Sequence, residues 1–599
     1  MERLKYVKLI LSVLVILGFC VNTSLAQNQT VKGKVTDKSS GSSLPGVNIL
    51  VKGTTSGTAT DPNGNFTLNV SSLQDTLVFS YIGYQTQTVP IKGRTTINVQ
   101  MTSRTISSKE LVVVGYGSQE KKTITSSVTS VSSSDFNKGT INNPAQLLQG
   151  KVSGLTITQP SGDPNGNPQI RLRGLSSIGA NSSPLIVIDG VPGASLSSVD
   201  PNDIKSIDVL KDASSSAIYG TRGSGGVIII TTKSGSLTSA GKAKFNIEYN
   251  GSVAISNPYH EIKVLNAAQY KSLSGTTDLG SSTNWLGAIT HTGIDQVHEL
   301  AFTGGAKNTT YRASLNYRDV NGIEKQTGFN QLNGRLNLTQ YALDQKLTFT
   351  VNLSVTNKNQ KLGFPEAFRY ATIYNPTAPI MNPKNATYGG YFQENAFDYF
   401  NPVAIVQQNI NNGNRKQILG SLKGEYDFSD YIPGLSLSGF YSEQRRSDSN
   451  NQYYPSTSLY RGSNRNGLAR ESSNDYTDRL AQSTLHYTNT ILSGLDVDAV
   501  AGYSYQEFLH TNNFIDTGDF ITNAFTFNNL GASQDLSNGL ATVTSEKDSH
   551  KLIAFFGRAN FNYKDTYFAS ASIRHEGSSR FGKNNKWGNF WAVNGGVQL

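Results

Sequence analysis

The chain has 599 residues, of which 37% are hydrophobic and only 16% are charged. Its formal net charge of +10 is spread along the chain, so the sequence does not mark a nucleic-acid-binding surface. Cys20 is the single cysteine, which excludes an intramolecular disulfide framework. Low apolar and low charged contents together are typical of a strand-rich membrane wall, because half of each strand is then polar.

A signal peptide is predicted at the start of the chain. Three basic residues precede an apolar run: Arg3, Lys5, Lys8 and then Leu9–Phe19. The run ends before Ser24-Leu25-Ala26, so we expect residues 1–26 to be removed by cleavage between Ala26 and Gln27. No other stretch approaches the ~20 apolar residues that a spanning helix needs, so any membrane crossing must use strands.

A lipoprotein is the alternative interpretation of this segment, because Cys20 is a possible acylation site. Phe19 and Val21 flank it, however, where small residues are expected. We therefore expect a mature N-terminus at Gln27, which mass spectrometry of the membrane form checks. A lipid-modified Cys20 at the N-terminus would contradict this expectation.

Residues 27–102 are predicted to form a small β-sandwich. Five short β-rich runs are separated by turn residues: Val31–Val35, Val47–Val51, Asn65–Val70, Thr76–Ser80 and Thr96–Met101. A linker over residues 103–122 follows, polar from Ser103 to Lys109 and apolar in Leu111–Gly117. Residues 123–235 then mix strands with short helices, and the apolar run Gly226–Thr232 is typical of a buried core strand.

Residues 241–599 are predicted to form about twelve transmembrane β-strands. Ala243, Phe245, Ile247, Tyr249, Gly251 and Val253 alternate with polar residues, and Leu347, Phe349, Val351, Leu353 and Val355 do the same. The strand connections alternate between short and long. We expect short turns at Gly304–Thr309, Tyr341–Lys346, Ser429–Pro433, Ser493–Gly494 and Lys564–Thr566, and long loops at Tyr259–Val297, Lys358–Arg415, Ser447–Asp478 and Thr511–Ser549. A soluble sandwich is the alternative, but soluble strands are usually shorter.

Six spaced segments carry a family resemblance. They are Gln149–Leu155, Ile170–Gly174, Pro184–Pro192, Asp203–Asp212, Ile218–Gly223 and Gly225–Lys233. In this order they resemble the plug of the SusC/RagA family of TonB-dependent outer-membrane transporters. Residues 30–102 resemble the carboxypeptidase-regulatory-like module of that family, and Phe555–Tyr563 and Gly577–Gly582 resemble its barrel strands.

The resemblance implies a mainly β protein with a β-sandwich, an α+β plug and an antiparallel transmembrane barrel. It places the TonB box at Leu111, Val112, Val113, Val114, Gly115, Tyr116 and Gly117. It places plug-motif residues at Arg171, Arg173, Gly174, Asp189, Gly190, Lys211, Asp212, Tyr219, Gly220, Arg222 and Gly223. Barrels of such transporters have 22 strands, so we expect a partial barrel in this chain.

The function that the resemblance implies is active import across the outer membrane, with no catalytic site and no cofactor. The implied partners are TonB, a SusD-like surface lipoprotein, a glycan or peptide cargo, and outer-membrane lipid. The N-terminal module and the TonB box are expected in the periplasm, where an exposed strand can add to the sheet of TonB. A siderophore or vitamin receptor, a passive porin and a barrel-based adhesin remain as alternatives.

Charged residues of the plug motifs are candidates for holding the plug in a polar lumen, or for folding the plug internally. They are Arg171, Arg173, Asp189, Lys205, Asp208, Lys211, Asp212 and Arg222. Loop aromatics have two interpretations as well, loop packing or stacking on sugar rings. They are Tyr370, Tyr374, Tyr388, Tyr391, Phe392, Tyr399 and Phe400.

Two Asp-x-Asn-x-Asn runs, starting at Asp61 and Asp163, resemble the beginning of a calcium loop. Neither has Gly at the sixth position or Glu at the twelfth, so tight turns explain both better. The glycines from Gly220 to Gly226 precede a strand, whereas a phosphate loop opens a helix. No pair among the seven histidines has metal-binding spacing such as i, i+4, so we predict no metal site.

Overall fold

A computed structural model defines residues 29–38, 41–81, 84–102, 111–139, 141–159, 161–174, 182–235, 244–259, 261–384, 386–394 and 396–598. The chain divides into two compact units, residues 1–110 and residues 111–599. The expected cleavage site at Ala26 and Gln27 and the polar linker Ser103–Lys109 lie outside the described residues.

The first unit is a β-sandwich of two small sheets. Its strands are β1 (Gln29–Asp37), β2 (Asn48–Val51), β3 (Gly57–Ala59), β4 (Asn65–Val70), β5 (Thr76–Ser80), β6 (Gln87–Pro90) and β7 (Val99–Met101). One sheet has the order β4-β1-β7 and the other β3-β2-β5-β6. Alternate residues of these strands, such as Val31, Phe66 and Phe79, fill the core between the sheets. Strands β3 and β6 were missed in the sequence, because each contains only one or two residues that favour strands.

The second unit begins with β8 (Leu111–Val113) paired to β9 (Ser118–Glu120), and continues into a small mixed sheet. That sheet contains β10 (Val128–Ser132), β13 (Leu185–Ile188), β14 (Val191–Pro192), β15 (Ile204–Leu210) and β16 (Val227–Thr232). Its order is β10-β15-β16-β13-β14, and a separate pair joins β11 (Leu155–Thr158) to β12 (Gln169–Leu172). The apolar run that was predicted to be a core strand is β16, which lies at the centre of the sheet. We call residues 123–235 the plug segment.

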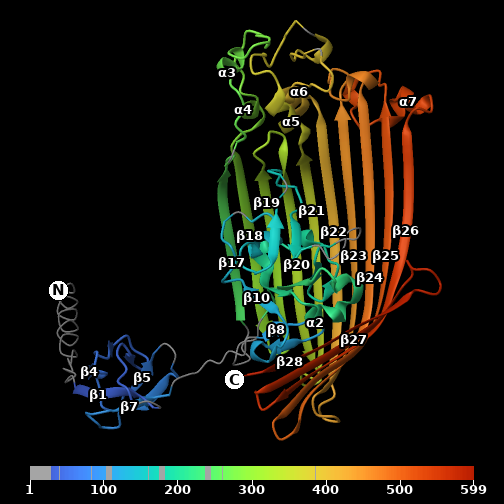
Figure 1. The fold of residues 1–599 in the computed structure, drawn as a ribbon. Helices are drawn as coiled ribbons and strands as arrows, with labels where there is room; N and C mark the ends of the chain where they lie inside the picture. Colours follow the sequence, from blue (N-terminus) through green and yellow to red (C-terminus); the bar gives the residue numbers. More distant parts are fainter. Residues whose placement is uncertain are drawn as a thin grey trace, which may run out of the picture. The chain divides into compact units, whose positions relative to one another are not determined.

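A twelve-stranded antiparallel sheet follows in the described part of the chain, with its strands in sequence order. The strands are β17 (Lys244–Ser256), β18 (Gly293–Ala306), β19 (Thr309–Asn321), β20 (Thr327–Ala342), β21 (Leu347–Leu362), β22 (Ile410–Asp427), β23 (Leu435–Tyr454), β24 (Leu468–Leu492), β25 (Leu495–Gly518), β26 (Thr542–Tyr563), β27 (Tyr567–Ser578) and β28 (Trp587–Val597). Figure 1 shows the sheet curving around the plug segment. We call this sheet the wall. The predicted fold class is confirmed.

The two faces of the wall differ in the predicted way. Phe245, Ile247, Tyr249 and Val253 of β17 are between 56 and 69% exposed, as a lipid-facing row requires. On β21, Phe349 and Val355 are exposed, whereas Ser354 and Thr356 are buried against the plug segment. We call the exposed face outward and the plug-facing side inward.

The long loops are shorter than predicted. The segment 448–477, expected as a loop, consists largely of the ends of β23 and β24, and only residues 455–467 connect these strands. Strands β25 and β26 likewise extend into the expected loop Thr511–Ser549. In the upper parts of these strands, polar and apolar residues do not alternate regularly, so they lack the pattern that identifies a strand inside lipid.

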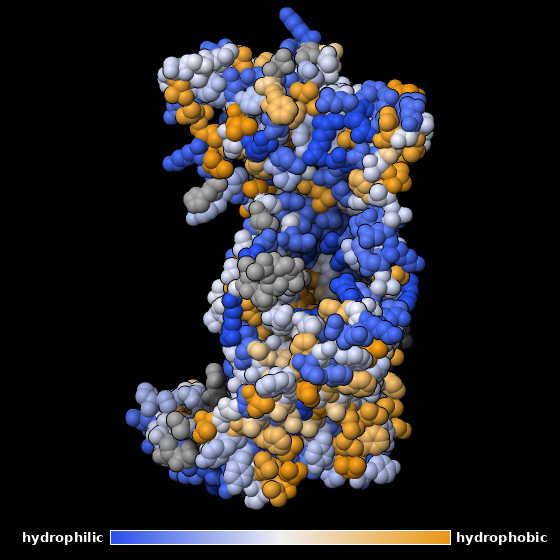
Figure 2. Space-filling view, turned by 45° about the vertical axis from the view of Figure 1, so that its right-hand side comes forward, coloured by the Kyte–Doolittle hydropathy of each residue, from blue (hydrophilic) through white to orange (hydrophobic). Residues whose placement is uncertain are grey.

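The connections at the upper end contain short helices: α3 (Ala267–Lys271), α4 (Trp285–Ile289), α5 (Glu366–Ile373), α6 (Pro402–Gln408) and α7 (Gln534–Ser537), while α2 (Ala213–Ser216) belongs to the plug segment. Among the described residues, no helix is long and apolar enough to cross a membrane. Figure 2 shows hydrophobic residues gathered over the lower half of the wall and hydrophilic residues over its upper half.

Candidate functional site

The segment Leu111–Gly117 is not the fully extended strand that the sequence predicted. Strand β8 ends at Val113, and a tight turn follows in which the Val114 amide donates to the Gly117 carbonyl at 3.0 Å. The turn depends on Gly115, whose φ of 87° lies in the left-handed region that glycine adopts without strain. Val112 and Val114 are buried instead of being presented to solvent.

Tyr116 holds this turn against both the plug segment and the wall. Its ring stacks on Tyr219 of the plug segment, with centroids 5.6 Å apart, and on Phe556 of β26, with centroids 4.1 Å apart. The Arg558 side chain on β26 donates to the Val114 carbonyl. The predicted TonB box is therefore docked on the wall beside the plug-motif residue Tyr219.

Two buried carboxylates of the plug segment meet arginines of β19. Arg318 forms a fork with Asp200, and its second amino group donates to the Ile141 carbonyl at 2.7 Å. Arg312 donates to Asp203 and to Glu299 of β18, at 2.8 Å each. Asp200, Asp203 and Glu299 are fully buried, so each charge depends on its arginine partner.

Asp203 is the most extensively bonded of these carboxylates. Besides Arg312, it accepts from the Ser314 hydroxyl and from the Asn316 amide, both at 2.9 Å. Burial raises the pKa of the Asp203 carboxyl, and the neighbouring Arg312 acts in the opposite direction. Three side chains of the wall strand β19 thus donate hydrogen bonds to this one carboxylate of the plug segment.

The plug-motif residue Asp189 makes a third pair of this kind, with Arg335 of β20. It also accepts from the Thr232 backbone and hydroxyl, at 2.9 and 2.8 Å, and so links strand β16 to the wall. We call the three pairs, Asp189–Arg335, Asp200–Arg318 and Asp203–Arg312, the arginine seat. All three arginines come from β19 and β20, which places the seat on one side of the wall.

The opposite side of the plug segment contacts β25 and β27. The Thr221 hydroxyl donates to Glu576 at 2.7 Å, and Arg574 donates to the Ile218 carbonyl at 3.1 Å. Arg222 donates to Gln506. Gly220 fits here with a φ of 65°, because an added Cβ would lie 2.7 Å from a Glu576 oxygen.

Three other predicted plug residues make their contacts inside the plug segment. Asp212 accepts from the Ser127 and Ser215 amides at 2.6 and 2.9 Å, which caps α2. Lys211 and Arg173 reach serine hydroxyls of the same segment, at 3.3 and 3.4 Å. Of the rest, Arg171 lies on β12, Asp208 is buried on β15 and Lys205 is exposed on β15. Gly174 and Gly190 have positive φ, Gly190 faces Phe440 of the wall, and Gly223 packs against the Ser216 carbonyl.

Sequence reasoning missed Asp200 and Asp203 as contacts to the wall. They flank Pro201 and Asn202 in a short helical turn just before β15. One sequence signal pointed to Asp203: it is the first residue of a plug-like motif and directly precedes a buried strand. Their arginine partners lie more than a hundred residues later, so spacing along the chain could not reveal the pairs.

Five of the seven loop aromatics pack in one hydrophobic cluster, as the first of the two interpretations predicted: Tyr370, Tyr374, Phe392, Tyr399 and Phe400. The rings of Tyr374 and Tyr399 stack with centroids 4.5 Å apart, and Trp285 contacts Tyr374 edge-on. Tyr370 packs in the same way against Phe400. These faces are occupied by protein, so they form a folded cap at the upper end of the wall.

The two Asp-x-Asn-x-Asn runs are turns. Asp61 accepts from the Asn63 and Asn65 amides at 2.9 and 2.8 Å, and Asp163 accepts from the Asn165 amide at 2.9 Å. Within the described ranges, no three His, Cys, Asp or Glu side chains are arranged to hold a metal ion.

Comparisons with known proteins agree with this architecture. Residues 31–113 match the family model of the CarboxypepD_reg-like domain, and residues 120–227 match the TonB-dependent receptor plug domain. The chain is 33% identical to the TonB-dependent receptor SusC of Bacteroides thetaiotaomicron, over 95% of this chain and 58% of that protein. It is 31% identical to the TonB-dependent receptor P39 of Formosa agariphila, over 97% of this chain and 56% of that protein.

Among solved structures, the RagAB peptide importer in its open-open state is similar with a TM-score of 0.68 and 22% identity. The match covers 81% of this chain and 58% of that chain, and at this identity it shows the fold alone. The chain spans 56 to 58% of the length of the two curated relatives described above.

Proposed function

We propose that this chain, a relative of the SusC TonB-dependent receptors along almost its entire length, serves the TonB-dependent import of a nutrient across the outer membrane. The cargo we propose is a glycan oligosaccharide or a peptide, captured together with a SusD-like surface lipoprotein. The N-terminal sandwich and the segment Leu111–Gly117 then face the periplasm. The relatives are receptors, which favours transport over catalysis.

One observation carries this proposal: the plug segment fills the inward face of the wall and is continuous with the docked segment Leu111–Gly117. A passive porin needs neither part. A siderophore or vitamin receptor shares both, but the relatives at 31 to 33% identity favour the SusC type.

The strengths of the contacts suggest an order of events. Stacked aromatic pairs contribute about 0.5–1.5 kcal/mol each, whereas breaking a buried ion pair costs about 3–5 kcal/mol. A pull from TonB would therefore first free Tyr116 from Phe556, and only then unseat the three arginine pairs. TonB could pull through a strand pairing between Leu111–Val113 and one of its own sheet edges, since such a pairing needs few side-chain contacts.

Whole-cell uptake tests the proposal. With the protein in its native membrane, a labelled oligosaccharide or peptide should accumulate in the periplasm above its outside concentration. A protonophore should abolish that accumulation, because the pull on the plug requires energy. Equal concentrations on the two sides, unaffected by the protonophore, would indicate a passive pore and remove the import proposal.

A further inference from the structure

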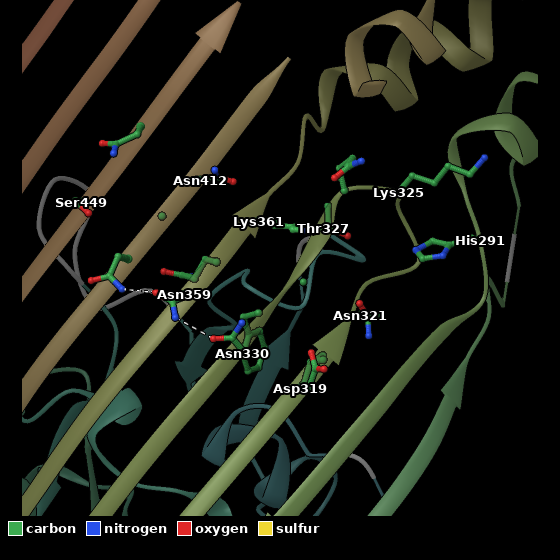
Figure 3. A pocket seen from close by; sticks show the side chains of 18 of the residues that line it. His291, Asp319, Asn321, Lys325, Thr327, Asn330, Asn359, Lys361, Asn412 and Ser449 are labelled. Atoms are coloured by element: carbon green, nitrogen blue, oxygen red, sulfur yellow. Dashed lines mark hydrogen bonds between the residues drawn. The ribbon is translucent and has the colours of Figure 1, made fainter. Parts of the chain in front are cut away.

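A recess of about 750 Å³ opens on the outward face near the upper rim of the wall. Its lining is rich in side-chain amides on β19–β23, and it includes Asp319, Asn330, Asn359, Lys361 and Asn414. Figure 3 views these side chains from the face opposite the plug segment, whose ribbon lies behind the strands. We call this cavity the outer recess.

The alternation of the strands fixes which face the outer recess occupies. On β19, Arg318 reaches Asp200 of the plug segment, so the next residue, Asp319, points outward. On β21, Gln360 donates to Asn165 of the plug segment at 3.0 Å, so its neighbours Asn359 and Lys361 point outward as well. The outer recess is therefore separate from the space inside the wall that the cargo would cross.

A ladder of amides crosses three strands at the outer recess. Asn359 donates to Asn330 at 2.9 Å and accepts from Asn414 at 2.6 Å, as Figure 3 shows for the first bond. Each amide has two N–H donors and an oxygen with two lone pairs, so the ladder leaves further groups for a ligand. Neutral donors and acceptors in a row suit the hydroxyl groups of a sugar.

Positive charge accompanies these amides. Lys361 and Lys325 line the same cavity, against the single carboxylate of Asp319, and the Lys325 ammonium donates to the Ala288 carbonyl at 2.7 Å. A lysine ammonium binds phosphate as a point charge. The lining thus combines sugar-binding and phosphate-binding chemistry.

An apolar surface lies directly below the outer recess on the same strands. The next outward residues toward the short turns include Tyr317, Leu332, Val355 and Ile418, which are between 43 and 49% exposed. They lie two to four residues from Asp319, Asn330, Asn359 and Asn414, or about 7–13 Å along a strand. One molecule with apolar chains and a polar head can touch both surfaces.

The polar boundary continues around the wall as an alternating row of charges. Arg479 of β24 pairs with Glu443 at 3.1 Å and with Glu507 at 3.4 Å, and Lys551 of β26 lies 3.6 Å from Glu507. Just below this row the outward face turns apolar, for example at Phe555. The amide ladder and the charged row therefore mark one membrane boundary.

We propose that the outer recess binds the sugar-phosphate head group of an outer-leaflet glycolipid, whose acyl chains lie on the apolar surface below. This inference rests on the proposed placement of the chain in the outer membrane. The amide ladder binds the sugar hydroxyls, and Lys361 binds a phosphate. The lipid fixes the height of the wall in the outer leaflet, and it takes no part in cargo recognition.

Lipid retention tests this inference. The purified protein is transferred into phosphatidylethanolamine vesicles that contain rough lipopolysaccharide, lipid A without core sugars, or neither, and the retained glycolipid is counted by native mass spectrometry. The variant N359A/N414A should retain about tenfold less rough lipopolysaccharide than the unaltered protein, because the hydrogen bonds of both amides to the sugar are lost. Lipid A has sugar hydroxyls and phosphates of its own, so the unaltered protein should retain it as well.

The matched control is N513A, which alters an exposed asparagine of β25 on the same face, outside the lining of the outer recess. It should retain the lipid fully, and both variants should keep the melting temperature of the parent. Equal retention of rough lipopolysaccharide by N359A/N414A and N513A would overturn the inference, and so would a failure of the unaltered protein to retain either glycolipid. Retention in a protein that does not import would leave the inference intact while removing the proposed function.

Discussion

Deleting Leu111–Gly117 from the chromosomal gene should reduce cargo uptake to background while changing cargo affinity by less than about twofold. The segment is the part of the second unit that precedes the plug segment, so it is where a pull from the periplasm can act. Cargo contacts would lie on the upper side of the plug and on the loops. Uptake by whole cells and binding to purified protein must be measured separately.

The matched control removes the same number of residues, Ser103–Lys109, from the neighbouring polar linker and keeps the proposed TonB box. This variant should import cargo, because it keeps the segment on which TonB would pull. The deletion of Leu111–Gly117 should also stay impermeable to large hydrophilic antibiotics, because the arginine seat is untouched. Equal loss of uptake and binding, with normal protein in the membrane, would contradict an energy-coupling role for this segment.

Replacing Tyr116 separates docking of this segment from its recognition by TonB. Tyr116→Phe keeps both stacked rings, so it should import like the parent. Tyr116→Ala removes the stacks on Tyr219 and Phe556 and leaves β8 intact, so it should still import and should expose the segment to protease. A complete loss of uptake in Tyr116→Ala would show that TonB binds this side chain directly.

The sequence predicted the parts of the fold whose pattern is local. The alternation in Phe245–Val253 and Leu347–Val355 reflects lipid on one side and polar surroundings on the other, and this contrast exists only within the membrane. Above the boundary the strands meet water, loops or the cap, so residues such as Asn450 and Asn474 carry no such signal. For that reason the upper parts of β23–β26 were expected as loops.

The arginine seat could not be predicted for a different reason. A buried carboxylate is tolerated only where a partner neutralises it, and the partners of Asp200 and Asp203 are on β19. Distance in sequence gives no measure of distance in space once a plug lies inside a curved sheet. The predicted residues Asp189 and Arg222 do contact the wall, whereas Asp212 and Lys211 serve the internal fold.

Replacing Arg312 by methionine should destabilise the seated plug by about 3–5 kcal/mol. The change leaves two buried carboxylates, Asp203 and Glu299, without the cation that joins them. The plug segment should then unfold at lower urea concentration in the purified protein, and cells should admit a large hydrophilic antibiotic. Adding D203N removes one of the two carboxylate charges that repel each other, so it should restore part of the lost stability.

The matched control is Arg479→Met on the outward face. Arg479 also meets two carboxylates, Glu443 and Glu507, but its side chain is 43% exposed, and such pairs contribute only about 0–1 kcal/mol. A loss in R479M as large as that in R312M would show that burial of the pair is not the cause.

Acidic pH should reduce the loss of plug stability that R312M causes. Burial holds the folded-state pKa of Asp203 above its unfolded value, so the folded plug binds a proton more tightly than the unfolded one. The contribution of this carboxyl to the free energy of unfolding therefore falls as pH rises between the two pKa values. Arg312 lowers the pKa of Asp203, so its removal extends that window to higher pH. The penalty in R312M should be largest near neutral pH and shrink as the medium is acidified, and a penalty that grows on acidification would contradict the assignment of Asp203 as the stranded charge.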